Sequence, residues 1–495
     1  MKLRGVFMSS YLGVDLGTSN LKILLFSKED GIIDLESKKI DSYQPKEGIH
    51  EQNPEEWVKK TVSLLQKILE RNKKYVPQIE AIGFSGQMHG LVCIDSKGNP
   101  LFPCMTWVDQ RSKNESSYIS NVIDIFNITG NLSNPSFTLP KILWLKNNEK
   151  EKYKKAFCFF QPKDFLRFKL GKNKLKITDK TDASATLLMN IKTQRWSEDI
   201  LKSFEIDPQK LPEIKNSHEI VDYLDDEIAK QLGLKKNIPL VAGAGDQEAA
   251  AIGLGITNEK ESFISCGTAA QIFRTTKELF FDKSLGIHLF SYPFTGWHYL
   301  GAIQNAGNVL EWALNILNLD YNEIEKIDRK KDNNLYFLPY LTGERTPIMD
   351  ENARGVWIGL NTSHTRKDML KSVLEGISFS IKLAYTQITH ISGFEYITYF
   401  IGGASKSRMW SQMIADIVER ELSVLNIYEG SAYGAALLSA IGTGGIQIQD
   451  LTFFKPKIKE KIIPNKAMFS SYNEKYERFI RLINLEKSFR NNYDK

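Results

Sequence analysis

A short turn near the start of the chain has the residue types of a phosphate-binding loop. Residues 15–19 read Asp-Leu-Gly-Thr-Ser and lie between two apolar runs. Gly17 lets backbone amides approach phosphate oxygens closely, and the hydroxyls of Thr18 and Ser19 can donate to them. Asp15, at the end of the first run, could hold Mg²⁺ through water. A plain β-hairpin has the same residue types, so this turn alone does not decide between the two interpretations.

The same pattern returns in the second half of the chain. Residues 262–273 read as a strand, a turn that contains Gly267 and Thr268, and a second strand. When residues 17–18 are set beside residues 267–268, apolar residues align on both sides. We interpret this as an internal duplication that gives two lobes, each opening with a phosphate-loop hairpin.

A further glycine-rich segment follows a predicted buried strand at residues 396–401. Gly402 and Gly403 would let a nucleotide approach the backbone, although a generic strand-to-helix turn has the same composition. The chain contains no Gly-x-x-x-x-Gly-Lys-Ser/Thr sequence, which excludes a Walker A loop. It is also unlike a Rossmann fold, because the first strand continues into a hairpin and not into a helix.

Asp246 lies between a short predicted strand at residues 239–243 and an alanine-rich helix at residues 248–254. A carboxylate at a strand end, next to the small Gly245, suits a general base that takes a proton from a bound substrate. Aspartate is also a common helix N-cap, and the spacing alone leaves both roles open.

A polar loop at residues 85–90 reads Ser-Gly-Gln-Met-His-Gly. Gln87 and His89 could form hydrogen bonds with sugar hydroxyls, while Met88 would pack on the sugar carbons. The alternative is a loop with a satisfied surface histidine, and the loop itself does not separate these interpretations.

Periodic patterns predict the elements that hold the N-terminal candidates. Apolar residues at 11–16 and 21–26 predict a β-hairpin around the first turn. Residues 54–71 have helical spacing, with Asn53 suited to the N-cap and Pro54 to the first helical position.

Similar patterns place the other candidates. A strand at residues 79–85 leads into the Gln-Met-His loop, and residues 91–95 predict a second, hairpin-like strand. Residues 407–420 have helical spacing, and the charged residues after about 455 predict a terminal helix with a frayed end.

The composition limits the class of protein. The 495 residues are 42% hydrophobic and 25% charged, which is ordinary for a globular chain of about two to four domains. No run of about 18 apolar residues predicts a membrane span, and the short apolar start lacks a signal-peptide cleavage site. We therefore expect a cytoplasmic protein with no membrane partner. Translation could begin at Met1 or at Met8, and the sequence leaves open whether the protein is a homodimer.

Charge and cysteine content exclude two further classes. The net charge of +6 comes from basic residues scattered among acids, so we expect no nucleic-acid partner. The four cysteines are widely spaced and form no Cys-x-x-Cys pair. They predict reduced thiols, not a zinc site or a disulfide framework.

Longer segments of the chain resemble the FGGY carbohydrate kinases, and within them the xylulose kinases. One family pattern appears at residues 136–148 as Ser-Phe-Thr-Leu-Pro-Lys-Ile-Leu-Trp-Leu-Lys-Asn-Asn. The other begins with Gly-Val-Trp-Ile-Gly-Leu at residues 355–360 and continues to Glu375. Shorter similar segments lie at residues 107–111, 162–166 and 337–347, and the resemblance extends from about residue 11 to residue 445.

This resemblance implies an α/β protein with the two-lobed actin-like, ribonuclease-H-like ATPase fold and a central cleft between the lobes. It places an N-terminal lobe at residues 9–250 and a C-terminal lobe at residues 251–450. A charged helical extension would follow at residues 451–495.

The resemblance also implies roles for individual residues. Asp246 is the implied general base, and Asp15 is implied to take part in catalysis and to hold Mg²⁺. The implied sugar contacts are Gln87, Met88, His89, Trp107, Asp109 and Gln247. The implied ATP contacts are Gly17, Thr18, Ser19, Gly267, Thr268, Gly307, Gly402, Gly403 and Ser407.

The implied reaction is the ATP-dependent phosphorylation of a ketose, with D-xylulose converted to D-xylulose 5-phosphate. Sedoheptulose kinases can share the Gln-Met-His-Gly loop, so sedoheptulose, xylitol and ribulose stay open as substrates. The alternative from another class is a catalytically silent sugar-binding regulator. Three residues depart from the family pattern: Gln247 and Ser407 stand where relatives have Asn, and Ala269 stands where Ser is common. The first bears on the sugar, and the other two bear on nucleotide affinity.

Overall fold

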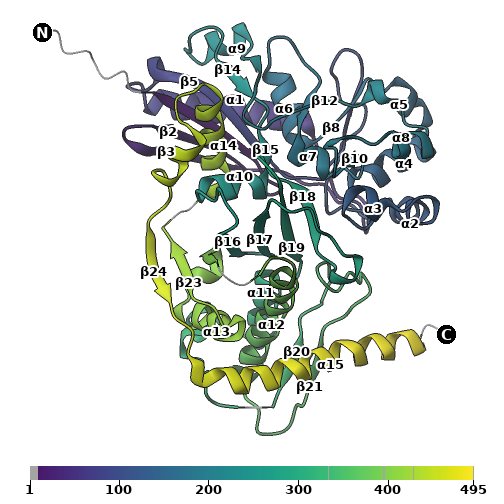
Figure 1. Cartoon of the computed structure of the whole chain (residues 1–495), viewed down its shortest axis with the longest axis vertical. Helices are drawn as coiled ribbons and strands as arrows, with labels where there is room; N and C mark the ends of the chain where they lie inside the picture. Colours follow the sequence, from purple (N-terminus) through teal and green to yellow (C-terminus); the bar gives the residue numbers. More distant parts are fainter. Residues whose placement is uncertain (1–8, 333, 394–395, 427–428, 494–495) are drawn as a thin grey trace, which may run out of the picture. The chain divides into compact units, whose positions relative to one another are not determined.

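The computed structural model describes residues 9–332, 334–393, 396–426 and 429–493, and the chain folds into two compact units (Figure 1). Unit 1 consists of Met1–Thr257, Phe290–Trp297 and Tyr428–Pro456. Unit 2 consists of Asn258–Leu289, His298–Ile427 and Lys457–Lys495. The N-terminal extension before residue 9, with both candidate start residues, lies outside the described residues.

Unit 1 is built on a seven-stranded sheet of order β13-β14-β5-β1-β2-β3, in which β15 also pairs with β5. The first Gly-Thr turn joins β1 to β2, which pair antiparallel, and β1 pairs parallel with β5. The strands are β1 Ser10–Leu16, β2 Asn20–Ser27, β3 Gly31–Lys39, β5 Ile79–Gly86, β13 Ile220–Tyr223, β14 Pro239–Val241 and β15 Ala244–Gly245.

Short strand pairs and helices surround this sheet. The pairs are β4 Glu51–Gln52 with β7 Cys104–Met105, β6 Val92–Ile94 with β8 Cys158–Phe160, β9 Ile177–Asp179 with β12 Glu213–Lys215, and β10 Met189–Asn190 with β11 Arg195–Trp196. The helices are α1 Pro54–Arg71, α2 Lys113–Val122, α3 Ile125–Thr129, α4 Thr138–Asn148, α5 Lys150–Lys155, α6 Pro162–Leu170, α7 Lys180–Ser184, α8 Glu198–Ser203, α9 Asp226–Gln231, α10 Asp246–Gly253 and α14 Gly430–Gly442.

Unit 2 has its own seven-stranded sheet, of order β18-β19-β17-β16-β22-β23-β24. Its strands are β16 Glu261–Cys266, β17 Ala270–Thr276, β18 His288–Ser291, β19 Trp297–Ile303, β22 Ile397–Ile401, β23 Leu422–Leu425 and β24 Ile458–Ile462. A separate pair joins β20 Tyr336–Leu338 to β21 Val356–Ile358. The helices are α11 Gly307–Leu317, α12 Arg366–Ser392, α13 Arg408–Val418 and α15 Phe469–Tyr493.

The two large sheets repeat one topology, as the internal duplication predicts. In unit 1, β1 pairs antiparallel with β2 and parallel with β5, and β14 continues parallel to β5. In unit 2, β16 pairs antiparallel with β17 and parallel with β22, and β23 continues parallel to β22. An antiparallel strand follows next in each sheet, β13 in the first and β24 in the second. The α/β class and the repeated sheet agree with the expected fold.

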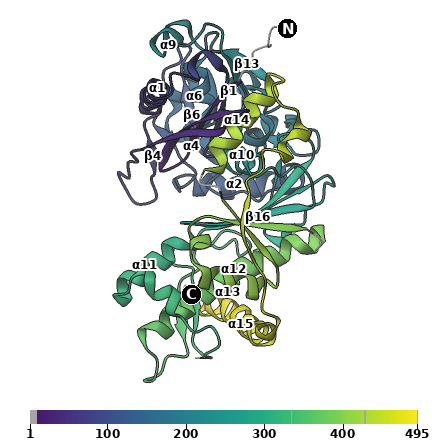
Figure 2. The ribbon, with the colours of Figure 1, turned by 90° about the vertical axis from the view of Figure 1, so that its left-hand side faces the viewer.

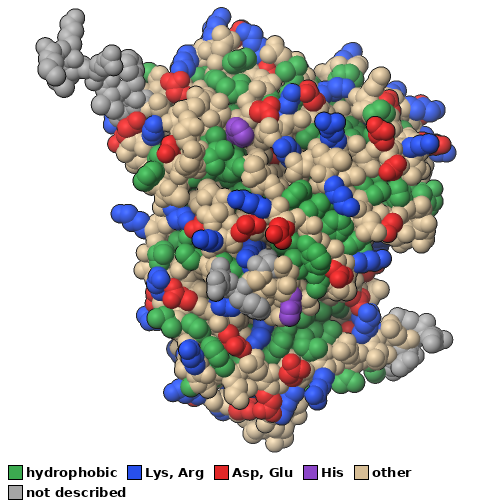
Figure 3. Space-filling view, in the orientation of Figure 1, with side chains coloured by type: hydrophobic (Ala, Val, Ile, Leu, Met, Phe, Trp, Pro, Cys, Tyr) green, Lys and Arg blue, Asp and Glu red, His purple; other side chains and the backbone are tan. Residues whose placement is uncertain are grey.

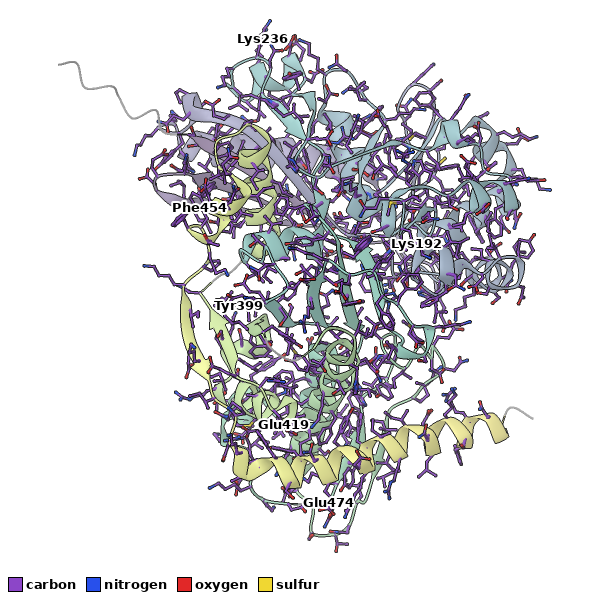
Figure 4. All side chains as sticks on the ribbon, viewed as in Figure 1. Lys192, Lys236, Tyr399, Glu419, Phe454 and Glu474 are labelled. Carbon is purple, nitrogen blue, oxygen red and sulfur yellow. The ribbon has the colours of Figure 1, made fainter. Side chains whose placement is uncertain are left out.

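Helix α14 belongs to unit 1, although almost all of the chain between residues 258 and 427 belongs to unit 2. It lies against β1 and α10 in both views (Figure 2). This approach needs glycine on the sheet: a Cβ at Gly13 or Gly83 would overlap the backbone oxygens of Ala432 and Ala435. Beside the helix, the ring of Phe454, labelled in Figure 4, lies 5.5 Å from that of Phe26.

The units therefore divide the chain differently from the contiguous segments 9–250, 251–450 and 451–495. Residues 430–442 pack on the first sheet, and β24 is a member of the second. The terminal helix α15 is not a loose extension, because Lys475 on it contacts the buried Glu375 of α12 at 3.3 Å. Packing between residues that are distant in the chain decides which unit each of these segments joins. Local sequence patterns do not indicate such packing.

Most of the expected elements form where the periodicity places them. Helix α1 occupies Pro54–Arg71, with the side chain of Asn53 accepting from the backbone N–H of Glu55. The strand expected at residues 91–95 is shorter, and it pairs with β8, not with β5 as a hairpin. The helix expected to begin at Glu248 begins two residues earlier, at Asp246.

Basic and acidic side chains are mixed on the surface, as the scattered charges along the sequence lead us to expect. On the face shown in Figure 3, Lys and Arg side chains alternate with Asp and Glu side chains. All four cysteines are buried and unpaired. Among the described residues, no helix is both long enough and apolar enough to cross a membrane.

Candidate functional site

Asp15 is the last residue but one of β1 in unit 1 and is almost entirely buried, with 4% of its surface exposed. Its Oδ1 accepts a hydrogen bond from Ser85 Oγ at 3.0 Å. Burial raises the pKa of Asp15, while the nearby Lys22 and the bond from Ser85 partly offset this effect. The carboxylate is thus held in place near the carboxyl end of an interior strand, two residues before Gly17 of the first Gly-Thr turn.

Asp246 is the first residue of α10, and Gly245 is the N-cap. The helix-cap interpretation of Asp246 is therefore wrong. The residue is partly accessible but densely surrounded, and burial, followed by repulsion from Asp15 and Glu248, raises its pKa to about 7. A carboxylate with this pKa can accept a proton at neutral pH and release it again.

Lys22 and Glu429 complete the charged group around these two carboxylates, and neither is among the candidates predicted from the sequence. Lys22 Nζ lies 2.5 Å from Glu429 Oε2. Burial alone would lower the pKa of Lys22, but the carboxylates of Asp15, Glu429 and Asp246 raise it. Lys22 comes directly opposite Asp15 in the β1–β2 register, which is a signal that the hairpin prediction contained.

The space beside Gly245 is filled by protein. A Cβ added to Gly245 would meet the Sδ and Cγ of Met88 at 2.8 Å and would overlap the carboxylate of Glu248. The glycine therefore admits the thioether of Met88, not the substrate as expected from the sequence. This packing brings the Gln-Met-His loop next to the start of α10.

Gln87 and Trp107 belong to one hydrogen-bond network with Thr18. Trp107 Nε1 donates to Thr18 Oγ1 at 2.8 Å, and this hydroxyl donates to Gln87 Oε1 at 3.4 Å. Gln87 Nε2 donates to Gln52 Oε1 at 2.9 Å, and Gln52 Nε2 donates to the Thr18 carbonyl at 2.7 Å. The network joins the first Gly-Thr turn to the Gln-Met-His loop, so Gln87 has protein partners for both ends of its amide.

His89 is buried and adopts a left-handed backbone conformation, with φ of 67°. Its Nδ1 lies 2.8 Å from the carbonyl oxygen of Ala185, so Nδ1 carries a proton. The ring of Phe137 meets the imidazole edge-on, and Thr138 and Lys141 donate to the carbonyl of His89. Residues 137–141 lie within the first family pattern, which here serves to fix the loop.

Asp109 and Gln247 differ in their contacts. Asp109 is fully buried, and both its oxygens accept from Arg111 and one also accepts from the backbone of His50. Its contacts make it part of an internal ion pair and do not favour the expected contact with sugar. The backbone N–H and the side-chain amide of Gln247 both donate to the Asp246 carboxylate. The glutamine amide, which is longer than the asparagine of many relatives, therefore contacts the candidate base.

In unit 2, the Gly267-Thr268 turn joins β16 to β17 as predicted. A Cβ added to Gly267 would meet no atom within 4 Å, so packing within the protein does not require glycine there. Gly307, the first residue of α11, donates its N–H to the Gly267 carbonyl at 3.0 Å. Its close approach does require glycine, because a Cβ on Gly307 would overlap that oxygen.

Gly402 and Gly403 follow β22, as the sequence predicts. Gly402 has a φ of 92°, and a Cβ there would lie 2.6 Å from the Cys266 carbonyl oxygen. The glycine is therefore needed to bring this turn next to the end of β16. Ser407 caps α13: its hydroxyl accepts from the Trp410 N–H at 3.1 Å and donates to Glu325 Oε1 at 2.5 Å.

A buried carboxylate supports the segment that leads into α11, and sequence reasoning missed it. Glu344 accepts from the backbone of Gln304 at 2.7 Å and from the side chain of Asn305 at 3.1 Å. Burial raises the pKa of Glu344 to about 7. These bonds hold the residues directly before Gly307, and thereby the helix that abuts the second Gly-Thr turn.

The donor set around Asp15 fits a magnesium ion whose coordination phosphate oxygens and water would complete. Among the residues that the structure describes, no group of three or more His, Cys, Asp or Glu side chains could hold a metal alone. Mg²⁺ commonly uses one or two carboxylates and completes its coordination with phosphate oxygens and water. Two repelling carboxylates, Asp15 and Asp246, match that need.

Comparison with known proteins agrees with the repeated fold. Residues 10–253 match the N-terminal domain, and residues 262–443 the C-terminal domain, of the FGGY family of carbohydrate kinases. The xylulose kinase of Staphylococcus xylosus is 34% identical over 446 residues, which span 88% of this chain and 91% of the relative. The gluconokinase of Bacillus subtilis (strain 168) is 32% identical over 465 residues, 90% of each chain.

A solved structure has the same arrangement of elements. The crystal structure of a protein from Brucella ovis, described as a xyloylose kinase, superposes with a TM-score of 0.90 at 30% identity. The match covers 97% of this chain and 100% of that one. The two matched family domains together span most of the chain, so this protein belongs to the FGGY family of carbohydrate kinases.

Proposed function

We propose that this kinase transfers the γ-phosphoryl group of ATP to a ketose, and that D-xylulose, converted to D-xylulose 5-phosphate, is its substrate. The observation that carries the proposal is the Asp246 carboxylate, whose pKa is about 7, beside the Gln-Met-His loop. Relatives described as xylulose kinases support the choice of sugar.

Asp246 acts as the general base. It takes the proton from the attacking sugar hydroxyl as the oxygen of that hydroxyl bonds to the γ-phosphorus and the bond to the ADP oxygen breaks. Its pKa near the operating pH suits this task, because such a base is both largely available and basic enough. Gln247, which donates to the carboxylate, holds its orientation.

The nucleotide is held by backbone and charge. The Gly17-Thr18-Ser19 and Gly267-Thr268 turns supply amides and hydroxyls for the phosphates, and Gly402 and Gly403 accommodate the adenosine. Ser407 supports this region through its cap of α13, and Gly307 supports it by packing on the second turn. A bound Mg²⁺, held by Asp15, would neutralise charge on the phosphates.

The negative charges near the proposed sugar site favour a neutral substrate over an anionic one. His89, Met88 and Trp107 contact the ketose, and Gln87 positions the loop through Gln52 and Thr18. The alternative substrate, gluconate, is suggested by the gluconokinase relative and carries a carboxylate. That charge would meet the carboxylates of Asp15 and Asp246, and the nearby Lys22 is already paired with Glu429.

A screen of ADP release with Mg²⁺ and ATP tests this proposal. The acceptors are D-xylulose, D-ribulose, sedoheptulose, xylitol and D-gluconate. We expect kcat/KM for D-xylulose to exceed that for each of the others by about tenfold or more, as a hydroxyl-matching site allows. A higher kcat/KM for gluconate would overturn the choice of a ketose, and a higher value for sedoheptulose would overturn the choice of pentulose.

A further inference from the structure

A buried hydroxyl holds the turn that carries Asp246. The backbone N–H of Gly245 donates to Thr181 Oγ1 at 2.8 Å, and this hydroxyl donates to Asp179 Oδ2 at 2.8 Å. Thr181 is fully buried, in the first turn of α7. Because its proton is directed to a carboxylate, the hydroxyl oxygen presents a lone pair to Gly245.

Asp179 is itself fixed by a buried charge cluster. Its Oδ1 lies 3.0 Å from Lys163 Nζ, and its Oδ2 also accepts from Ser217 Oγ at 2.7 Å. Lys163 lies as close to the carboxylates of Asp164 and Asp182, and all four side chains are fully buried. Burial alone would lower the pKa of Lys163, but the three aspartates raise it. A buried ion group of this kind is costly to disrupt, which makes it a rigid anchor.

We propose that Thr181 is a positioning residue for phosphoryl transfer, through which the Lys163–Asp179 pair fixes the direction of Asp246. The relay runs from Lys163 through Asp179 and Thr181 to the amide of Gly245, the residue directly before the base. It rests on the proposed role of Asp246 as the general base. Its purpose is geometric: a base displaced by about 1 Å loses much of its effect.

The same segment offers a matched control. Thr178 is also buried, three residues before Thr181, and its hydroxyl has no hydrogen-bond partner among the described residues. Replacing either threonine with valine keeps the shape of the side chain. Only Thr181→Val removes the hydrogen bonds to Gly245 and Asp179, whereas Thr181→Ser keeps a hydroxyl at the same place.

The experiment measures kcat and both KM values for Thr181→Val, Thr181→Ser and Thr178→Val in the full-length protein. We expect Thr181→Val to lower kcat by about 10- to 100-fold, with the KM for ATP changed less than about twofold. Thr178→Val should stay within about twofold of the wild type, and Thr181→Ser should recover most of the lost kcat. Equal effects of the two valine variants, or an unchanged kcat in Thr181→Val, would overturn the proposal.

A double-mutant cycle separates this proposal from the assignment of the base. If Thr181 acts through Asp246, Thr181→Val should lower kcat less than about twofold further in an Asp246→Asn background. A full additional loss there would show that Thr181 acts independently of Asp246. Near wild-type turnover in Asp246→Asn alone would instead overturn the general base, whatever Thr181 does.

A second variant covers the case in which Thr181→Val fails to fold. Ser217→Ala removes one of the hydrogen bonds that fix Asp179, so it loosens the anchor of the relay while Thr181 keeps its bonds to Asp179 and Gly245. We expect kcat to fall by about two- to tenfold with an unchanged thermal midpoint within a few degrees. An unchanged kcat in a folded Ser217→Ala variant would count against the relay.

Discussion

At the scale of single residues, the site is a group of charges that oppose one another. Burial and the negative charge of Asp15 raise the pKa of Asp246, and burial raises the pKa of Asp15 itself. Lys22 compensates only in part, because it also pairs with Glu429. Such an arrangement costs folding free energy and is usually kept for chemistry. Asp246, the proposed general base, thereby has a pKa of about 7, and a Mg²⁺ ion bound with ATP would offset the negative charge of the carboxylates.

The first prediction concerns Asp246→Asn, which keeps the shape of the side chain but cannot accept the proton. Loss of a general base typically lowers the rate by about 10²–10⁴-fold. We expect kcat to fall by this factor while sugar and ATP still bind, as measured by calorimetry. A variant with normal turnover, or one that loses sugar binding altogether, would contradict the assigned role.

The second prediction concerns pH, and follows from the pKa of about 7 for Asp246. The base works only when ionised, so kcat/KM should rise with pH and level off above about pH 7. Stability should change in the opposite direction. The folded state holds this proton up to about pH 7, whereas the unfolded chain releases it near 3.8, so ionisation destabilises the fold as the pH rises between these values.

The stability effect has its own control. Asp246→Asn removes the ionisation, so the thermal midpoint of the variant relative to the wild type should be higher at about pH 8 than at about pH 4. A difference that does not change with pH would mean that Asp246 has an ordinary pKa in the folded protein.

The third prediction concerns His89, whose φ of 67° suits few residue types. Asparagine tolerates this conformation better than alanine, so His89→Asn tests the imidazole with the least backbone strain. Loss of a hydrogen bond to a neutral partner is about 0.5–1.5 kcal/mol, which predicts a two- to tenfold higher KM for the sugar. The KM for ATP should be nearly unchanged. A higher KM for ATP with an unchanged KM for the sugar would instead indicate that this loop binds the nucleotide.

At the scale of elements, two helices carry the residues that matter in unit 1. Helix α10 begins with Asp246, and α14 begins one residue after Glu429. The helices touch backbone to backbone, because a Cβ on Gly253 or Gly434 would overlap the partner helix. Ser431 Oγ also donates to the Asp246 carbonyl at 2.9 Å. One helix pair thus sets the distance between the base and the partner of Lys22.

The fourth prediction uses two glycines of one turn region in unit 2. Gly267→Val should fold normally, since a Cβ there meets no protein atom, but it should block close approach of the phosphates. Because phosphoryl transfer depends on positioning, we expect kcat/KM for ATP to fall by about tenfold or more. Gly307→Ala is the contrasting variant, and its overlap with the Gly267 carbonyl should lower the thermal midpoint. A fully active, folded Gly267→Val would rule out this turn as a phosphate site.

The sequence predicts elements more fully than contacts, for a physical reason. Hairpin β1–β2 and helix α1 follow from alternation, helical spacing and the Asn53 cap, which are all local. Helix α10 begins two residues before the predicted Glu248, and the amide of its N-cap, Gly245, bonds to Thr181, 64 residues away in the chain. The roles of Lys163 and Glu344 were missed for the same reason, since each is defined by partners distant in the chain.

At the scale of the whole molecule, duplication explains the two sheets but not the path of the chain. The Gly-Thr turns predict two copies of one sheet, and both copies form. The chain, however, returns to unit 1 after residue 427 to supply α14. Residues 432–441 of this helix are all buried, and its backbone at Ala432 and Ala435 lies against Gly13 of β1 and Gly83 of β5. Unit 1 is therefore incomplete without a segment that comes after about 430 of the 495 residues.

The fifth prediction follows from that path. A fragment of residues 9–257 lacks α14 and leaves the covered face of its sheet open to water, which costs about 25 cal/mol for each Å² of apolar surface. We expect it to bind a hydrophobic dye and to unfold without a cooperative transition. The same fragment joined by a flexible linker to residues 429–456 regains α14 and should melt cooperatively, as followed by circular dichroism. If the shorter fragment melted as sharply and at the same temperature as the longer one, α14 would contribute little to unit 1, and the glycine contacts at Gly13 and Gly83 would have another purpose.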